Sequence, residues 1–159
     1  MKKITHINND NKPQMVDVSK KKITSRSAHA QSSVIFPLEI IDRFVNGDIA
    51  TAKGPVFATA VIAGVMAAKK TYELIPFCHP IGLDDCTINI DLDEAGSAII
   101  NCICKVEHRT GVEMEAMVGA SVAALTIYDM CKALSHKIMI QETKLISKTG
   151  GKADFHCEK

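Results

Sequence analysis

The stretch Thr110–Lys132, which reads TGVEMEAMVGASVAALTIYDMCK, constrains the fold most strongly. Its apolar run predicts one long helix. Small residues make the middle of this helix slim: Ala116, Gly119, Ala120, Ser121, Ala123 and Ala124. A slim helix can pack very close to another backbone. Glu113 and Glu115 open the helix, and Asp129 and Lys132 stand near its end. Charged residues on such a helix are candidates for a role in catalysis or binding rather than in solubility.

Composition indicates a single globular domain over residues 1–159, with residues 1–14 as a polar, mobile arm. Hydrophobic residues make up 47% of the chain and aromatic residues 4%. The net charge of +1 argues against binding to nucleic acid or to a membrane surface. We recognise no signal peptide and no membrane span, because Glu115 and Asp129 interrupt the longest apolar stretch. We therefore expect a cytoplasmic protein.

The chain has six cysteines and no C-x-x-C pair: Cys78, Cys86, Cys102, Cys104, Cys131 and Cys157. Several of them lie inside apolar runs. This pattern is typical of reduced, mostly buried thiols, and we prefer that interpretation to disulfides or to zinc. We expect no metal site.

The remaining periodicities predict a sheet with a second slim helix. Ala58–Leu74 has helical spacing and stops at Pro76. Cys86–Leu92 and Ala98–Val106 alternate with period two and read as a hairpin. A last strand is expected at Ile138–Ser147, where the alternation is less clean.

Two weaker elements precede the slim helix. Thr24–Phe36 is rich in β-branched residues, although Ala28–Gln31 weakens the prediction of a strand there. Pro37 suits the first turn of a helix that Gly47 would end. The order of elements predicts a ferredoxin-like α+β sandwich, with an antiparallel sheet and its helices packed on one face.

Asp129 and Lys132 are three residues apart, so their side chains share one face of the helix. The simplest interpretation is a surface ion pair worth roughly 0.2–0.5 kcal/mol. The apolar neighbours Ile127 and Met130 suggest partial desolvation instead. A desolvated acid and amine can have shifted pKa values and can serve as general acid and base.

Glu115 lies almost four whole helical turns before Asp129, so both project from similar faces. At 1.5 Å per residue they are roughly 21 Å apart, too far for one small substrate. If two such helices pack antiparallel across a two-fold axis, Glu115 of one subunit approaches Asp129 of the other. Glu113 is explained by its place at the positive end of the helix dipole.

Other candidate contacts lie in loops. His79 stands beside Cys78 in a segment stiffened by Pro76 and Pro80, which suits a positioned ligand contact. Lys53-Gly54 and Lys148–Lys152 combine amines with glycine, and so with accessible backbone N–H groups that suit phosphate oxygens. Arg26 adds positive charge, whereas a solvated Lys-Gly turn is the plainer alternative.

These motifs, in this order, resemble the cyclic pyranopterin monophosphate synthase family of molybdenum cofactor biosynthesis. The resemblance covers nearly the whole chain. It rests on MVDVS at Met15–Ser19, Arg26, Lys53-Gly54, ATAVIAGVMAAKKTYELIPFCHP at Ala58–Pro80, TGVEMEAMVGASVAALTIYDMCKAL at Thr110–Leu134 and KTGGKADF at Lys148–Phe155. One position departs from the pattern: the family usually has Asp after Lys53-Gly54, and this chain has Pro55.

The resemblance implies a homohexamer, built as a trimer of dimers with sites between subunits. It implies a GTP-derived substrate, 3′,8-cyclo-7,8-dihydro-GTP, supplied by a separate radical S-adenosylmethionine enzyme. The products are cyclic pyranopterin monophosphate and pyrophosphate, so the activity is that of a lyase. No cofactor is required, and a role for Mg²⁺ stays open.

The resemblance also implies site residues, and the family's catalytic acid–base pair falls on Asp129 and Lys132. Its substrate contacts fall on Phe77, Cys78, His79, Met114 and Glu115, and we add Glu113; basic residues near the substrate fall on Lys53, Lys148 and Arg26.

Two alternatives come from other classes. A non-catalytic oligomeric module that binds a nucleotide or a partner enzyme also fits slim helices and scattered lysines, but it has no need of the Asp129–Lys132 pair. A thiol-bound metal protein would instead carry stoichiometric metal after purification.

Overall fold

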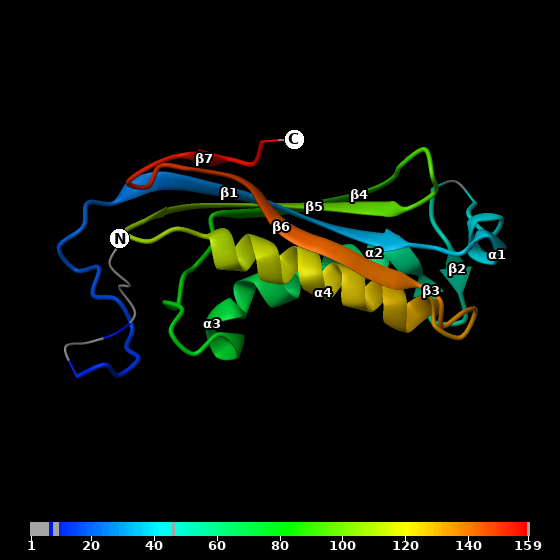
Figure 1. Cartoon of the computed structure of the whole chain (residues 1–159), viewed down its shortest axis with the longest axis horizontal. Coiled ribbons are helices and arrows are strands. Elements are labelled where there is room, and N and C mark those ends of the chain that lie inside the picture. The colour runs from blue at the N-terminus through cyan, green and yellow to red at the C-terminus, as the bar shows by residue number, and fades with distance from the viewer. Residues whose placement is uncertain (1–6, 8–9, 46, 159) are drawn as a thin grey trace.

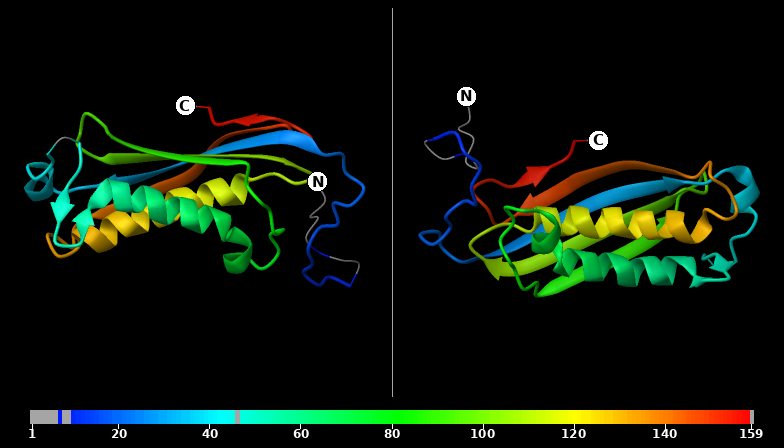
Figure 2. Two further views of the ribbon diagram at one scale, coloured as in Figure 1. Left: turned by 180° about the vertical axis from the view of Figure 1, so that it is seen from behind. Right: turned by 90° about the horizontal axis from the view of Figure 1, so that it is seen from below.

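The fold has two layers, a five-stranded antiparallel sheet and a pair of helices that cover one of its faces (Figures 1 and 2). The structure, a computed structural model, describes residues 7, 10–45 and 47–158. Its elements are β1 (Thr24–Ile35), α1 (Leu38–Ile41), β2 (Ala50–Thr51), β3 (Gly54–Pro55), α2 (Val56–Lys69), α3 (Thr71–Leu74), β4 (Asp85–Leu92), β5 (Ala98–His108), α4 (Glu113–Cys131), β6 (Met139–Thr149) and β7 (Phe155–His156).

The strand order β4–β5–β1–β6–β7 confirms the predicted ferredoxin-like α+β sandwich. Its core follows the expected β-α-β-β-α-β sequence of β1, α2, β4, β5, α4 and β6. Helices α2 and α4 lie side by side beneath the sheet in Figure 2. β7 is an addition that the sequence did not predict, and it pairs with the end of β6.

The two helices approach each other where both are slim, as the sequence predicted. A Cβ placed on Gly64 of α2 would lie 2.8 Å from the carbonyl oxygen of Gly119 on α4. Contacts under 3.0 Å are not tolerated without a shift, so each glycine permits the close approach of the other helix. Ala116, Ala120, Ala123 and Ala124 of α4 are buried against the rest of the core.

β1 is stronger than its sequence suggested. It runs unbroken through Ala28–Gln31 and pairs with both β5 and β6. Ala28 and Ala30 face the helices and are buried, so their small size fits the tight layer. On the opposite face, His29 and Gln31 both hydrogen-bond to Oδ1 of Asn101, at 2.9 and 3.0 Å. These cross-strand contacts compensate for weak strand propensity.

Two of the predicted helices were wrong in extent. The helix expected over Ala58–Leu74 is divided, because Lys70 leaves the helical conformation and Thr71 starts the short α3. The helix expected between Pro37 and Gly47 has a single turn. Phe44 then packs between the rings of Phe36 and Phe57.

The hairpin and the last strand lie close to their predicted positions. Ile100, Cys102, Cys104 and Val106 of β5 face the core, as the alternation indicated. β6 shifts register against β1 in two places, and Glu142 within it has φ of 51°. These irregularities account for the imperfect alternation of β6.

Among the described residues, helix α4 is long and apolar enough to cross a membrane by length and composition alone, even with Glu115 and Asp129 in it. Half of its most apolar window is buried in the fold, where it packs beneath the sheet. Of the arm predicted for residues 1–14, residues 1–6 and 8–9 lie outside the described part. The segment after it is anchored, since the carbonyl oxygen of Val16 hydrogen-bonds to His79.

Candidate active site

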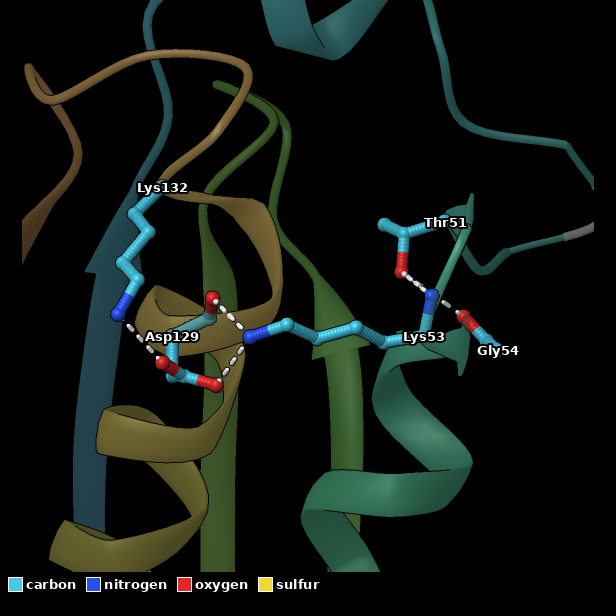
Figure 3. Close-up of polar contacts among 5 residues, drawn as sticks. All are labelled: Thr51, Lys53, Gly54, Asp129 and Lys132. Carbon is cyan, nitrogen blue, oxygen red and sulfur yellow. Dashed lines mark hydrogen bonds and ion pairs between the residues drawn. The ribbon is translucent and has the colours of Figure 1, made fainter.

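Three charged groups meet at the carboxyl end of α4 (Figure 3). Lys132 donates to Oδ1 of Asp129 at 2.7 Å, and Lys53 donates to Oδ2 at 2.6 Å. The Lys53 ammonium also reaches the backbone carbonyl of Asp129 at 3.2 Å. The shared face predicted for Asp129 and Lys132 is confirmed, and Lys53 joins them from the turn between β2 and β3.

That turn is held so that Lys53 points toward α4. Gly54 has φ of 106°, a conformation that favours glycine. The Thr51 hydroxyl donates to the Gly54 carbonyl and accepts from the Lys53 backbone N–H, each at 3.2 Å (Figure 3). The Gly54 carbonyl is thus engaged within the turn itself.

Pro55 begins α2 without a side-chain cap, as proline must. The carboxylate of Asp48 takes over this role. It accepts the backbone N–H of Phe57 at 2.8 Å and that of Ala58 at 3.4 Å. An acid placed seven residues earlier therefore satisfies helix donors that Pro55 cannot reach.

The charges at Asp129 are solvated in the single chain, contrary to the partial desolvation we expected. The side chains of Lys53, Asp129 and Lys132 are 53%, 52% and 47% exposed. Hydrogen bonds from Lys132 and then Lys53 lower the pKa of Asp129 to about 2. The same pairing raises the pKa of Lys132. Asp129 is therefore a carboxylate at neutral pH, between two cations.

The trio lies in an open hollow of about 670 Å³. Arg43, Thr51, Met130 and Leu134 also contribute to its wall. Three cationic side chains against one carboxylate make it suited to an anionic ligand. Each Asp129 carboxylate oxygen is bound to an ammonium group, which would compete with a metal ion such as Mg²⁺.

A second hollow, of about 300 Å³, lies at the amino end of α4. It brings together five predicted substrate contacts, namely Phe77, Cys78, His79, Met114 and Glu115. His79 Nε2 lies 2.8 Å from the Val16 carbonyl oxygen, so this nitrogen donates and the ring is fixed toward the N-terminal segment. Burial, followed by the nearby Glu115, raises the pKa of Cys78.

Glu115 differs from Asp129 in environment. Its side chain is 4% exposed, although it is an acid at the start of a helix. Burial, with a smaller contribution from Glu113, raises the pKa of Glu115 to about 7. A carboxyl with such a pKa can both give and accept a proton at neutral pH.

A basic hollow of about 250 Å³ adjoins the second one and shares Lys21, Thr110, Gly111 and Glu113 with it. Its other walls include Arg26, Lys148 and Lys152. Lys148 pairs with Glu113 at 2.9 Å, and Nε of Arg26 donates to the His108 carbonyl at 2.9 Å. The Gly150 N–H that we expected to be accessible donates to Asp154 instead, at 3.1 Å.

The predicted site residues thus form two groups. Lys53, Asp129 and Lys132 occupy one end of α4, and the remaining eight gather at the other end. Lys53 is separated from Lys148 and Arg26, with which it had been grouped by charge. The hollows at the two ends share no lining residue.

Comparison with known proteins shows the family of this chain. The model of the MoaC family matches residues 15–151, which includes every candidate site residue. The chain belongs to the MoaC family. A cyclic pyranopterin monophosphate synthase from Xanthomonas campestris pv. campestris (strain B100) is 54% identical over 155 residues, which span 96% of this chain and 93% of that protein.

Two longer proteins contain a part similar to this MoaC-family chain. Molybdenum cofactor biosynthesis protein 1 of Dictyostelium discoideum is 49% identical over 94% of this chain and 26% of its own length. A molybdenum cofactor biosynthesis bifunctional protein from Synechocystis sp. (strain ATCC 27184 / PCC 6803 / Kazusa) is 48% identical over 94% of this chain and 44% of its own length.

Some residues around the candidate site were not predicted from the sequence. Arg43 and Thr51 carry no motif, and only folding brings them to Asp129. Lys21 and Lys152 stand in lysine-rich segments, Lys20–Lys22 and Lys148–Lys152, and this clustering of charge is the signal that could have placed them in the basic hollow. Asp48 had no signal, because its contacts with α2 depend on the loop between them.

Proposed function

We propose that this chain is a cyclic pyranopterin monophosphate synthase. It converts 3′,8-cyclo-7,8-dihydro-GTP into cyclic pyranopterin monophosphate and releases pyrophosphate, as a phosphorus–oxygen lyase. Membership of the MoaC family and the name of the Xanthomonas relative support this activity. The observation that carries the proposal is the contact of Lys53 and Lys132 with opposite oxygens of Asp129, on the wall of a hollow whose charges suit an anionic ligand.

The cationic groups suit a triphosphate that loses pyrophosphate. Negative charge grows on the leaving phosphate as its bond to the substrate breaks, and nearby ammonium groups stabilise that charge. Lys53 and Lys132 supply positive charge at one end of α4. Arg26 and Lys148 supply positive charge at the other end. Asp129 holds its two ammonium groups in position for this work.

Glu115 supplies proton transfer near neutral pH. Rebuilding a purine-derived ring into a pterin needs several proton transfers, and a carboxyl with a pKa near 7 is suited to them. His79 lines the same hollow, with its ring fixed by the hydrogen bond to the Val16 carbonyl. No cofactor is required in this scheme, since the reaction transfers protons and phosphate without a net redox change.

A complete site then takes one end of α4 from each of two subunits. The ends are roughly 21 Å apart in one chain, so an antiparallel neighbour is needed to bring Glu115 to Asp129. A homohexamer built as a trimer of dimers provides such neighbours.

The protein would work in the cytoplasm with a radical S-adenosylmethionine enzyme that supplies its substrate. The bifunctional Synechocystis relative, of which this chain matches 44%, is consistent with a partner in the same pathway.

The Asp129→Asn variant tests the activity. It should fold and bind the cyclised GTP substrate, but release pyrophosphate at least about 10²-fold more slowly, because the two ammonium groups lose their anchor. Phosphate detection after pyrophosphatase treatment measures the release. Asp85→Asn is the control, since Asp85 pairs with Lys105 at 3.6 Å on the sheet edge and should be silent.

The same experiment separates the enzyme from a binding module. A module that only binds nucleotide would release no pyrophosphate in the native form. Full turnover by Asp129→Asn would remove Asp129 from the reaction.

A further inference from the structure

Three thiols converge between the sheet and the helices, at a distance from both ends of α4. Cys86 on β4 is the direct cross-strand partner of Cys104 on β5, and Cys102 lies two residues along β5 on the same face. The Sγ atoms of Cys86 and Cys104 are 3.8 Å apart, and those of Cys102 and Cys104 are 4.0 Å apart. All three sulfur atoms lie within 4.8 Å of one another.

These separations match a metal-centred triangle and not a disulfide. A disulfide joins two sulfur atoms at about 2.05 Å, and all six cysteines of the chain are free thiols. With a metal–sulfur bond of about 2.3 Å, three sulfur atoms in a planar triangle around one ion lie about 4.0 Å apart. The observed spacing therefore needs little side-chain movement to enclose an ion.

The surroundings allow an ion to enter but favour a low coordination number. Cys102 and Cys104 are completely buried, whereas Cys86 is half-buried and gives a route from the edge of the sheet. Helix α4 lies directly on the cluster, since a Cβ added to Gly119 would come within 2.7 Å of Cys102 Sγ. Among the described residues, His, Asp and Glu side chains do not join the three cysteines as a fourth ligand.

Metal binding displaces the protons of the three thiols, because a thiolate rather than a thiol is the metal ligand. Cys86 is the half-buried member of the cluster, so it is the first sulfur that an entering ion meets.

We propose that Cys86, Cys102 and Cys104 form a three-thiolate site for a soft metal ion, with monovalent copper as its occupant. Thiolates select Cu(I) and Zn(II) among the common ions. Zn(II) in protein sites almost always takes four ligands, and the cluster supplies three in an apolar pocket. Cu(I) is soft enough to be satisfied by three thiolates alone. The site is independent of pyrophosphate release and would stabilise β4, β5 and α4 when filled.

The test uses reduced, full-length protein without oxygen, and Cu(I) buffered by a chromophoric Cu(I) chelator. Native protein and Cys157→Ser, which removes an exposed thiol outside the cluster, should each retain one Cu(I) per chain. Cys86→Ser should bind Cu(I) at least tenfold more weakly while it still releases pyrophosphate. X-ray absorption of the native copper form should show three sulfur neighbours at about 2.3 Å.

The outcomes divide cleanly. Equal Cu(I) affinity in the native protein and Cys86→Ser, or two or fewer sulfur neighbours, overturns the site. Retention of Zn(II) with no Cu(I) overturns the choice of metal. If circular dichroism shows that Cys86→Ser does not fold, Cys104→Ala takes its place. The number of sulfur neighbours of copper in the native protein then still tests the site. Loss of pyrophosphate release in the native protein would bear on the proposed function and not on this site.

Discussion

Lys53 and Asp129 meet at 2.6 Å although 76 residues separate them in the chain. Asp129 is bonded on its other oxygen to Lys132, so one carboxylate holds two ammonium groups. All three side chains are about half exposed, and such surface pairs contribute little to stability. An arrangement that stabilises the fold so little, on the wall of a large hollow, is better explained by ligand binding than by folding.

Removing the ammonium group of Lys53 should impair turnover without unfolding the protein. We expect Lys53→Met to lower kcat by about 10²-fold, because one charge that stabilises the leaving phosphate is lost. The pKa of Asp129 should rise from about 2, since one of its two hydrogen-bond donors is gone. Carbon-13 NMR titration of the Asp129 carboxyl measures this shift directly.

Lys105→Met is the matched control for Lys53→Met. Lys105 also forms an exposed ion pair with an aspartate, Asp85, but it stands on β5 and lines none of the three hollows. Its removal should leave kcat within twofold of native. An equal loss in both variants would mean that the effect of Lys53 is general to surface charge.

Glu115 should make stability depend on pH near neutrality. Its pKa is about 7 in the folded chain and about 4.5 when exposed. Between these values the folded chain keeps the proton and the unfolded chain loses it, so the free energy of unfolding falls as pH rises. The fall should reach about 2–3 kcal/mol between pH 4.5 and pH 8. Urea unfolding across this range measures it.

Glu115→Gln should abolish that decline, since the amide does not titrate, while Glu107→Gln at an exposed position of β5 should leave it unchanged. A native protein whose free energy of unfolding is flat over this range would show that Glu115 is ionised when folded. Its proposed role in proton transfer would then lose its support.

The packing of α4 against the sheet can be tested at Gly119. A Cβ there would lie 2.7 Å from Cys102 Sγ, so Gly119→Ala must displace α4 or β5. We expect a loss of about 1–2 kcal/mol, after allowing for the higher helix propensity of alanine. Gly82→Ala is the control, because a Cβ at Gly82 meets nothing within 4 Å. Urea midpoints compare the two, and equal midpoints would refute the tight contact.

Much of the fold could be predicted from periodicity, because the pattern and the packing agree. The alternation in β4 and β5 places Ile100 and Cys102 correctly, and the small residues of α4 mark the close helix contact. The failures arise from tertiary structure. β1 overcomes its weak propensity through side-chain bonds to Asn101, and the break at Lys70 carries no glycine or proline signal.

The site could be predicted in part. Residues on one element, such as Asp129 and Lys132, follow from helical spacing. Groupings of residues from different elements do not follow from helical spacing. Their shared charge suggested that Lys53 and Lys148 lie together, whereas the fold puts them at opposite ends of α4. The meeting of Cys86 with Cys104 likewise depends on strand register, which no ligand spacing rule in the sequence reveals.

The central claim is that a complete site takes Glu115 from one subunit and Asp129 from another. Mixing subunits of the Glu115→Gln and Asp129→Asn variants, each inactive alone, tests it. In a mixed dimer one of the two sites has both native residues, so random mixing should restore about a quarter of native pyrophosphate release. Mixing Lys132→Met with Asp129→Asn should restore none, because those residues belong to the same end of one helix. No recovery in the first mixture would place the whole site within one chain and contradict the account.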